Sequence, residues 1–323
     1  MSYIHQALLR DRSLILSVDD SLRDAVSEWM PSLPQESAED HPEGPSIRVD
    51  RGLHDPFDEP ALPSLALGRV KAYVDSARGF AMLWSAQRDV HGVVDLRSRI
   101  ARVIVPDDAN PAQADLTSVL TISAALLLLR DGRSAMHAAA VVHPGTGRAW
   151  LLCGDSHSGK STTTANLIKA GWSYLSDDYV VVSRSGDSIE IEGWPDDFHL
   201  DEGWARGELT GVRGTFREDD LPAGKRLPFA QLGGVLFTSV SREEPTVVSE
   251  IPPIIALERL IRQSPWLVAD SESAAGVFDL LKDAASLDCG ELRAGFDTFS
   301  NPHLLGTIVR EFSDRARAMP GRE

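Results

Sequence analysis

The sequence has few of the features that an exported or membrane-spanning protein needs. Its 323 residues hold only two cysteines, Cys153 and Cys289, too few for a disulfide framework, so we expect a reducing compartment. The most hydrophobic run, Val119–Leu129, is well short of the ~20 residues that span a bilayer, and it predicts a buried helix. The N-terminus is too polar for the core of a signal peptide. We therefore expect a cytoplasmic protein with no membrane partner.

Positive charge is scarce as well. The chain has 32 Lys+Arg against 48 Asp+Glu, which gives a formal net charge of −16. A general nucleic-acid binder needs a basic surface to displace counterions, so we expect no nucleic-acid partner. The hydrophobic fraction of 42% and the charged fraction of 25% are ordinary for a globular protein. At this length the chain can bury the core of one large domain or of two smaller ones.

The first 110 residues favour strands. Alternating or continuous apolar runs predict strands at Ser13–Val18, Ile47–Asp50, Leu67–Val74, Phe80–Ser85 and Arg99–Val105. An amphipathic helix should follow the first of them and extend through Trp29, and Glu36–Glu59 is an acidic connection with little periodicity. We therefore predict a strand-rich accessory region over residues 1–110 and a second domain over residues 111–323.

The second half predicts mixed α/β structure. Helices are expected at Pro111–Leu129, Lys160–Ala170, Ala256–Arg262, Ser273–Ala284 and Pro302–Arg317. Strands are expected at His137–His143, Arg148–Cys153, Trp172–Leu175, Tyr179–Arg184 and Gln231–Val240. Residues 200–230 are charged and rich in Gly and Pro, which predicts a long loop.

One motif stands out between a predicted strand and a predicted helix. It matches the pattern GxxxxGK[ST] and consists of Gly154, Asp155, Ser156, His157, Ser158, Gly159, Lys160 and Ser161, with Thr162 next. Backbone N–H groups of such a loop converge on phosphate oxygens at the positive end of the helix. Lys160 would then reach the β- and γ-phosphates, and the Ser161 hydroxyl would ligate Mg²⁺. The alternative is a glycine turn before a helix with an accidental Lys-Ser.

Two adjacent carboxylates, Asp177 and Asp178, follow the next predicted strand. They suit one metal ligand and one base, because acids near Mg²⁺ stay ionised. The alternative is a solvated turn, since Ser-Asp-Asp is good turn chemistry. His137 opens the strand before the motif; a histidine at a strand edge is often structural, but beside the motif strand it can hydrogen-bond the acids.

The run from Met136 to Val182, MHAAAVVHPGTGRAWLLCGDSHSGKSTTTANLIKAGWSYLSDDYVVV, closely resembles the catalytic core of the HPr kinase/phosphorylase-like family. The resemblance implies a P-loop (Walker A) core related to that of phosphoenolpyruvate carboxykinases, a mixed sheet with flanking helices. It further implies that Asp177 is the general base, that Asp178 and Ser161 hold Mg²⁺, and that His137 matches the family's active-site histidine. The clear part covers about residues 133–195.

Some residues depart from the family pattern. The bifunctional enzymes usually carry Glu where this chain has Thr162, and their C-terminal signature has no counterpart here. The first 110 residues do not resemble their regulatory domain. The resemblance therefore implies a monofunctional kinase, in the manner of the HPr-kinase-like enzymes that phosphorylate a serine of lasso-peptide precursors.

We expect ATP, or another nucleoside triphosphate such as GTP, and Mg²⁺ as cofactors, and a peptide or small protein as the phosphoacceptor. A small-molecule kinase for an amino acid or sugar, and a nucleotide-binding switch or NTPase, remain open, as does a homo-oligomer. Arg213, Lys225 and Arg226 form a cationic set that could clamp phosphates or an acidic substrate, unless they are ordinary charges of a solvated loop.

Overall fold

The computed structural model describes residues 2–9, 12–27, 29, 44–52, 65–67, 69–111, 115–194, 197–204, 210–217, 220–221, 225–241 and 243–318. These residues form two compact units. The first consists of Met1–Ala135 and Pro265–Phe278, and the second of Met136–Ser264 and Asp279–Glu323. Most of the acidic connection predicted at Glu36–Glu59 lies outside the described residues, apart from 44–52.

The first unit is built on one eight-stranded sheet in the order β1-β2-β3-β8-β7-β6-β5-β4. Its strands are β1 (Ser2–Leu9), β2 (Arg12–Asp19), β3 (Ser46–Gly52), β4 (Leu65–Leu67), β5 (Val70–Asp75), β6 (Phe80–Ser85), β7 (His91–Asp95) and β8 (Ile100–Pro106). The strands β2, β3 and β8 are mutually parallel, and the other pairs of neighbouring strands are antiparallel. The strand-rich character expected of the N-terminal region is therefore present.

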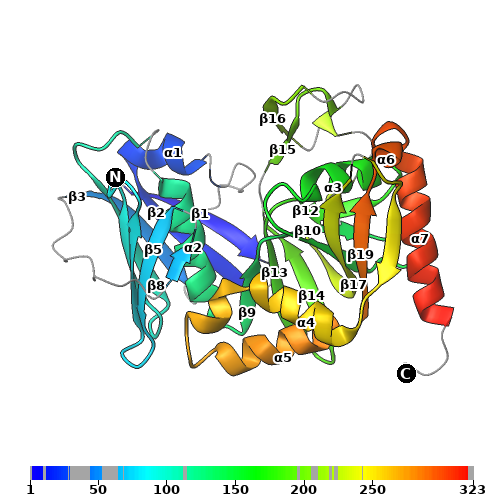
Figure 1. Cartoon of the computed structure of the whole chain (residues 1–323). Helices are drawn as coiled ribbons and strands as arrows, with labels where there is room; N and C mark the ends of the chain where they lie inside the picture. The colour runs from blue at the N-terminus through cyan, green and yellow to red at the C-terminus, as the bar shows by residue number, and fades with distance from the viewer. Residues whose placement is uncertain are drawn as a thin grey trace. The chain divides into compact units, whose positions relative to one another are not determined.

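The apolar run Val119–Leu129 lies in α2 (Leu116–Leu129), as the sequence predicts. This helix packs against β6, β7 and β8 (Figure 1), and its leucines are almost wholly buried. It belongs to the first unit, so the compact units divide the chain later than residue 110. No helix among the described residues is long and apolar enough to cross a membrane.

The second unit contains a mixed sheet with the strand order β12-β10-β11-β17-β14-β13, and β19 and β18 continue it beyond β17. Its strands are β10 (Ala138–Val142), β11 (Ala149–Cys153), β12 (Ser173–Ser176), β13 (Val180–Ser185), β14 (Ser188–Gly193), β17 (Phe229–Val240), β18 (Val247–Glu250) and β19 (Asp288–Ala294). The strands β11, β17 and β19 are mutually parallel, and the remaining pairs are antiparallel. A short strand, β9 (Arg133–Met136), leads the chain into this unit.

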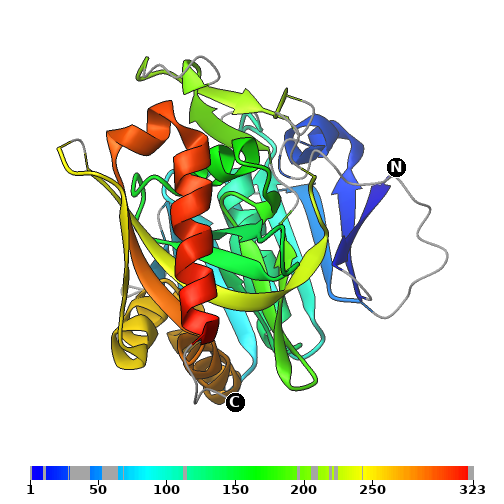
Figure 2. The same cartoon turned by 90° about the vertical axis from the view of Figure 1, so that its right-hand side faces the viewer.

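Helices flank this sheet. They are α3 (Lys160–Lys169), α4 (Pro253–Arg262), the short α6 (Phe296–Ser300) and α7 (Pro302–Ala318), while α5 (Ala274–Ala285) spans the boundary between the units. In Figure 2, α7 crosses in front of the strands of the second unit. The predicted α/β class with a mixed sheet and flanking helices is thus observed.

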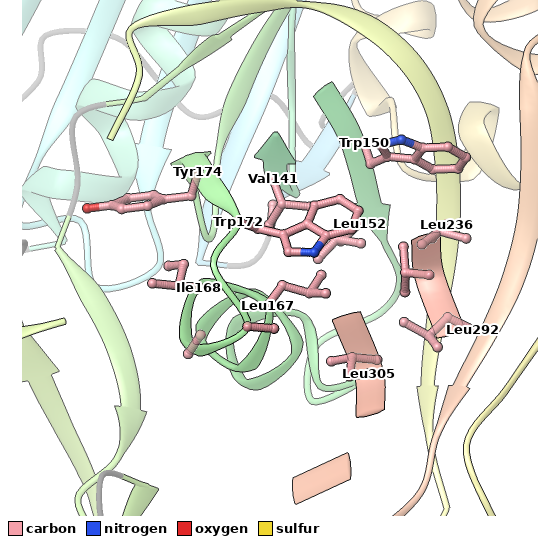
Figure 3. Packing of buried hydrophobic residues seen from close by; sticks show 14 of the residues in the cluster. Val141, Trp150, Leu152, Leu167, Ile168, Trp172, Tyr174, Leu236, Leu292 and Leu305 are labelled. Atoms are coloured by element: carbon pink, nitrogen blue, oxygen red, sulfur yellow. The ribbon is translucent and has the colours of Figure 1, made fainter. Parts of the chain in front are cut away.

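Every second residue of the central strands faces α3 and α7. Trp150 and Leu152 of β11 pack there with Leu236 of β17 and Leu292 of β19, as Figure 3 shows. The helices contribute Leu167, Ile168 and Leu305 to the same cluster. Because α3 begins at the end of the glycine loop, this core fixes the position of that loop.

The prediction of a long loop over residues 200–230 was wrong in part. Two short strands, β15 (Phe198–Asp201) and β16 (Arg213–Phe216), pair antiparallel as a separate two-stranded sheet. The carboxylate of Asp201 accepts hydrogen bonds from the N–H groups of Gly203, Thr210 and Gly211, which lie between the two strands. Such side-chain-to-backbone hydrogen bonds leave no apolar periodicity in the sequence. The strands β1, β7, β9, β14, β18 and β19 were also not predicted.

Replacing Leu167 by Ala should destabilise the second unit. The side chain is wholly buried in the cluster around α3, so its loss should lower the free energy of unfolding by about 2–5 kcal/mol. Guanidinium unfolding followed by tryptophan fluorescence measures this, since Trp150 and Trp172 belong to the same cluster. Ile254→Ala is the control: this side chain is 70% exposed, and its truncation should change the free energy by less than about 0.5 kcal/mol.

Candidate active site

Three segments that carry the candidate residues leave the sheet at the same edge. The strand β10 lies between β11 and β12 and is antiparallel to both. Its first residue, Ala138, pairs with Cys153, the last residue of β11, and Ala140 pairs with Ser176, the last residue of β12. His137, the glycine loop (Gly154–Gly159) and the Asp177-Asp178 pair therefore start from neighbouring strand ends.

The glycine loop is braced against β17. The hydroxyl groups of Ser158 and Thr238 lie 3.1 Å apart, and the Thr238 hydroxyl donates to the carbonyl of Cys153. The chain then turns into α3 at Gly159, whose φ is +89°. A Cβ at this position would lie 2.5 Å from Cγ2 of Val240, so both the backbone conformation and the packing require glycine.

The packing of the loop also requires glycine at position 154. A Cβ on Gly154 would lie 2.5 Å from the Ser158 hydroxyl and 2.9 Å from the carbonyl oxygen of Thr238. The side chains of Asp155, Ser156 and His157 are exposed, which leaves the backbone of the loop able to approach a ligand closely. Ser161 and Thr162, in the first turn of α3, are half-buried. The strand, loop and helix predicted at the motif are present, and phosphate binding remains a prediction.

Lys160 differs from its expected position. The sequence predicts a solvent-side point charge, but this residue is only 6% exposed. Its Nζ donates hydrogen bonds to the loop's own carbonyls, 2.8 Å to Gly154 and 3.2 Å to Asp155. Burial lowers the pKa of Lys160, and the negative charges of Asp178 and other nearby acids partly oppose that shift. The ammonium group is thus held inside the loop.

The acid pair divides into a buried and an accessible carboxylate. Asp177 is 2% exposed, whereas the side chain of Asp178 is 45% exposed. Oδ1 of Asp178 lies 2.9 Å from Nε2 of His137, so the strand register brings together two of the three residues predicted as catalytic. The ring of Tyr179 packs on His137 with 5.4 Å between ring centroids, which orients the imidazole.

Several influences set the pKa of Asp178. Desolvation alone would raise it, but the hydrogen bond from His137 and the positive charges of His137, Lys160 and His199 outweigh that effect. The pKa of Asp178 therefore lies below its ordinary value, and the group is a carboxylate at neutral pH. The nearby thiol of Cys153 behaves in the opposite way, because burial raises its pKa to about 12 and keeps it protonated.

The predicted cationic set is only partly placed at this site. Arg226 donates from Nη2 to the carbonyl of Trp194 at 2.8 Å, a structural contact. Residues 225–227 flank β12 through backbone hydrogen bonds with Tyr174, so Lys225 and Arg226 are not in a loose loop. Arg213 lies on β16 and is exposed. Residues 218, 219 and 222–224 of this stretch lie outside the described residues.

Sequence reasoning missed the residues that support the site from other elements. Thr238 and Val240 brace the glycine loop, and Nε2 of Gln263 at the end of α4 lies 3.3 Å from Oδ1 of Asp155. His199 of β15 contributes positive charge near Asp178. For Thr238 and Val240 the sequence offered one signal, their alternation along the predicted strand Gln231–Val240. Gln263 and His199 lie far from the motif in the sequence, and only the fold brings them close to it.

The residues present fit nucleotide and Mg²⁺. Among the described residues no group of three or more His, Cys, Asp or Glu forms a metal site. Mg²⁺ does not need one, since it is usually bound through one or two protein oxygens together with phosphates and water. Ser161 and Asp178 offer a hydroxyl and an ionised carboxylate for this purpose, and the glycine loop offers a cradle that side chains would fill.

The chain is similar to known proteins in structure and not in sequence. No family model matches this chain, and neither does any curated protein. Among solved structures, the HPr(Ser) kinase/phosphatase from Coxiella burnetii is similar, with 13% sequence identity and a TM-score of 0.33. The match covers 57% of this chain and 99% of that one. Both the identity and the TM-score are low, so the chemistry of this chain has to be inferred from its own residues.

Replacing Gly159 by Ala should abolish tight binding of ATP, the ligand that the motif predicts. The added Cβ would meet Val240 in a backbone conformation that alanine rarely adopts, so the loop must rearrange. Calorimetric titration with ATP measures the effect, which we expect to be at least tenfold. Gly171→Ala is a matched control, because its φ of +88° is nearly the same but a Cβ there would meet nothing within 4 Å. Equal affinity losses in both variants would contradict this account.

Replacing His137 by Ala should raise the pKa of Asp178. The variant loses both the hydrogen bond and the positive charge that hold this pKa down, while burial continues to act in the opposite direction. A carbon-detected NMR titration of the Asp178 carboxyl should therefore show a midpoint at higher pH than in the wild type. His303→Ala, an exposed change on α7, should leave the midpoint unchanged. A lower midpoint in His137→Ala would show that the pair is not coupled as described.

Proposed function

We propose that this protein is an ATP- and Mg²⁺-dependent kinase that transfers the γ-phosphoryl group to a serine-type hydroxyl of a peptide or small protein. The observation that carries the proposal is the register of β10, which places the glycine loop and the acid pair at one sheet edge. A module that only binds nucleotide needs the loop but has no use for a carboxylate base beside it.

The loop and Lys160 supply the phosphate-binding part of the mechanism. Backbone N–H groups of the loop and of the first turn of α3 hold the phosphates at the positive end of that helix. The Lys160 ammonium, already directed at the loop, offsets negative charge on the transferred group. Mg²⁺ held by Ser161 and Asp178 would neutralise further charge between the phosphates.

The acids act on the acceptor side. Asp177 accepts the proton of the acceptor hydroxyl on its carboxylate as that oxygen attacks the γ-phosphorus, while the bond from the γ-phosphorus to the β,γ-bridging oxygen breaks and ADP leaves. Its burial requires the hydroxyl to enter the site and excludes water, which favours transfer over hydrolysis. His137 holds Asp178 in its ionised form and fixes its direction through the 2.9 Å contact.

The two acids should therefore respond differently to removal of charge. Asp177→Asn should spare ATP affinity and reduce the rate of transfer by about 10²–10⁴-fold, the usual contribution of a general base. Asp178→Asn should weaken ATP binding in the presence of Mg²⁺ and have little effect in its absence. Calorimetry with ATP and with GTP, and mass spectrometry of serine-containing peptides and free serine, measure the two steps. Asp187→Asn, in the turn after β13, is the control for loss of an exposed acid.

The same experiment separates the competing functions. Phosphate on free serine but not on peptides would favour a small-molecule kinase. Nucleotide hydrolysis without any phosphorylated acceptor would favour the switch or NTPase. Equal losses of nucleotide affinity in the two variants would contradict the division of roles between Asp177 and Asp178.

A further inference from the structure

The β15–β16 hairpin has one apolar face and one polar face. Phe198 and Leu200 are buried in the cluster around α3, and Phe216 packs against it. Because side chains alternate along a strand, His199 points to the opposite face and is exposed. The register pairs His199 with Thr215 and Asp201 with Arg213, so Arg213 lies on this outer face, diagonally across from His199.

The hairpin is fixed beside the strand that carries the acid pair. The ring of Phe198 packs edge-to-face on Tyr174 of β12, with 5.0 Å between centroids. Tyr174 also donates from its N–H to the carbonyl of Lys225 at 3.2 Å. Contacts with Tyr174 therefore fix the positions of both the strand that carries His199 and the segment that carries Lys225. The strand of Tyr174, β12, ends just before Asp177.

The two positive charges of this surface, on Arg213 and Lys225, and the imidazole of His199 are available to a ligand. His199, Arg213 and Lys225 are exposed, and their side chains form no hydrogen bond or ion pair with the part of the chain that the structure describes. Asp201, the acid that pairs with Arg213 in the register, accepts hydrogen bonds from backbone N–H groups of Thr210 and Gly211, which hold its pKa near 2. A chain with a net charge of −16 thus presents cationic groups beside its candidate catalytic acids.

We propose that His199, Arg213 and Lys225 form the acceptor-binding surface, and that this surface selects a polypeptide segment with acidic side chains next to its serine-type hydroxyl. The inference rests on the proposed kinase function and specifies its substrate class. The overall negative charge would repel such a segment elsewhere on the protein, so local positive charge determines both its affinity and its orientation. The three residues bind the acceptor and take no part in the chemical step.

The test uses the full-length protein and three labelled peptides that share a central serine. The flanking residues are Glu in the first, Ser and Gly in the second and Lys in the third; a second set carries Ala in place of the central serine. Binding of the Ala set is measured by fluorescence anisotropy, and phosphate transfer to the serine set by mass spectrometry. The variants are His199→Gln, Arg213→Glu and Lys225→Glu, with Arg148→Glu as the control, since Arg148 precedes β11 at the opposite end from the glycine loop.

We expect the wild type to prefer the Glu-flanked peptide and to lose that preference at high salt. Arg213→Glu and Lys225→Glu should each weaken its binding by about tenfold, the scale of turning one exposed attraction into repulsion, and should improve binding of the Lys-flanked peptide. In transfer assays the change should appear in KM for the peptide, while kcat and the affinity for ATP stay constant. His199→Gln should have a smaller effect in the same direction, and Arg148→Glu none.

The outcomes separate this inference from the kinase proposal. Wild-type transfer with no difference among the flanks, or with flank preference unchanged in the variants, overturns the inference and leaves the kinase proposal standing. Charge-dependent binding of the Ala peptides without any phosphate transfer supports the surface and counts against the kinase. Loss of ATP affinity in Arg213→Glu or Lys225→Glu would assign these residues to the nucleotide instead. Absence of peptide binding by the wild type, together with intact ATP binding, would also overturn the inference.

Discussion

The position of β10 between β11 and β12 is the constraint on which the candidate site depends. Antiparallel pairing on both sides makes the start of β10 meet the ends of its two neighbours. The motif loop and the acid pair are separated by a helix and a strand in the sequence, yet they emerge side by side, with His137 between them. The hydrogen bond between His137 and Asp178 is a direct consequence of that register.

Much of this arrangement could be predicted from the sequence, because strong local patterns encode it. The apolar strand, the glycines and Lys160 predict a strand–loop–helix unit, and Gly171 ends α3 with a φ of +88° as its position suggests. The burial of α2 also follows from its composition. Tertiary contacts decide the rest. The hairpin β15–β16 is held by Asp201 and by packing on α3, and β19 (Asp288–Ala294) lacks the alternation that marks most strands.

The burial of the charged residues at the candidate site could not be predicted from their residue types. A lysine next to a phosphate motif suggests an exposed cation, whereas Lys160 is enclosed and satisfied by two carbonyls. The sequence of the acid pair does not show which carboxylate is exposed, and the structure encloses Asp177 and leaves Asp178 accessible. In both cases the backbone around the site, not the side chain itself, determines how much water remains. The low pKa of Asp178 has a different origin: burial alone would raise it, and the hydrogen bond from His137 together with the nearby positive charges outweighs that effect.

The bracing of the glycine loop by β17 has a consequence for how the loop's shape is encoded. Three alternate residues of this strand perform different tasks: Leu236 fills the core, Thr238 bonds Ser158, and Val240 contacts Gly159. A slip of one residue in the pairing of β17 with β11 would turn all three to the opposite face. The eight residues of the motif therefore do not determine the conformation of the loop by themselves, because residues of β17 also contribute to it. Grafted onto another strand–helix junction, without a neighbour such as β17, they would keep their sequence and lose their shape.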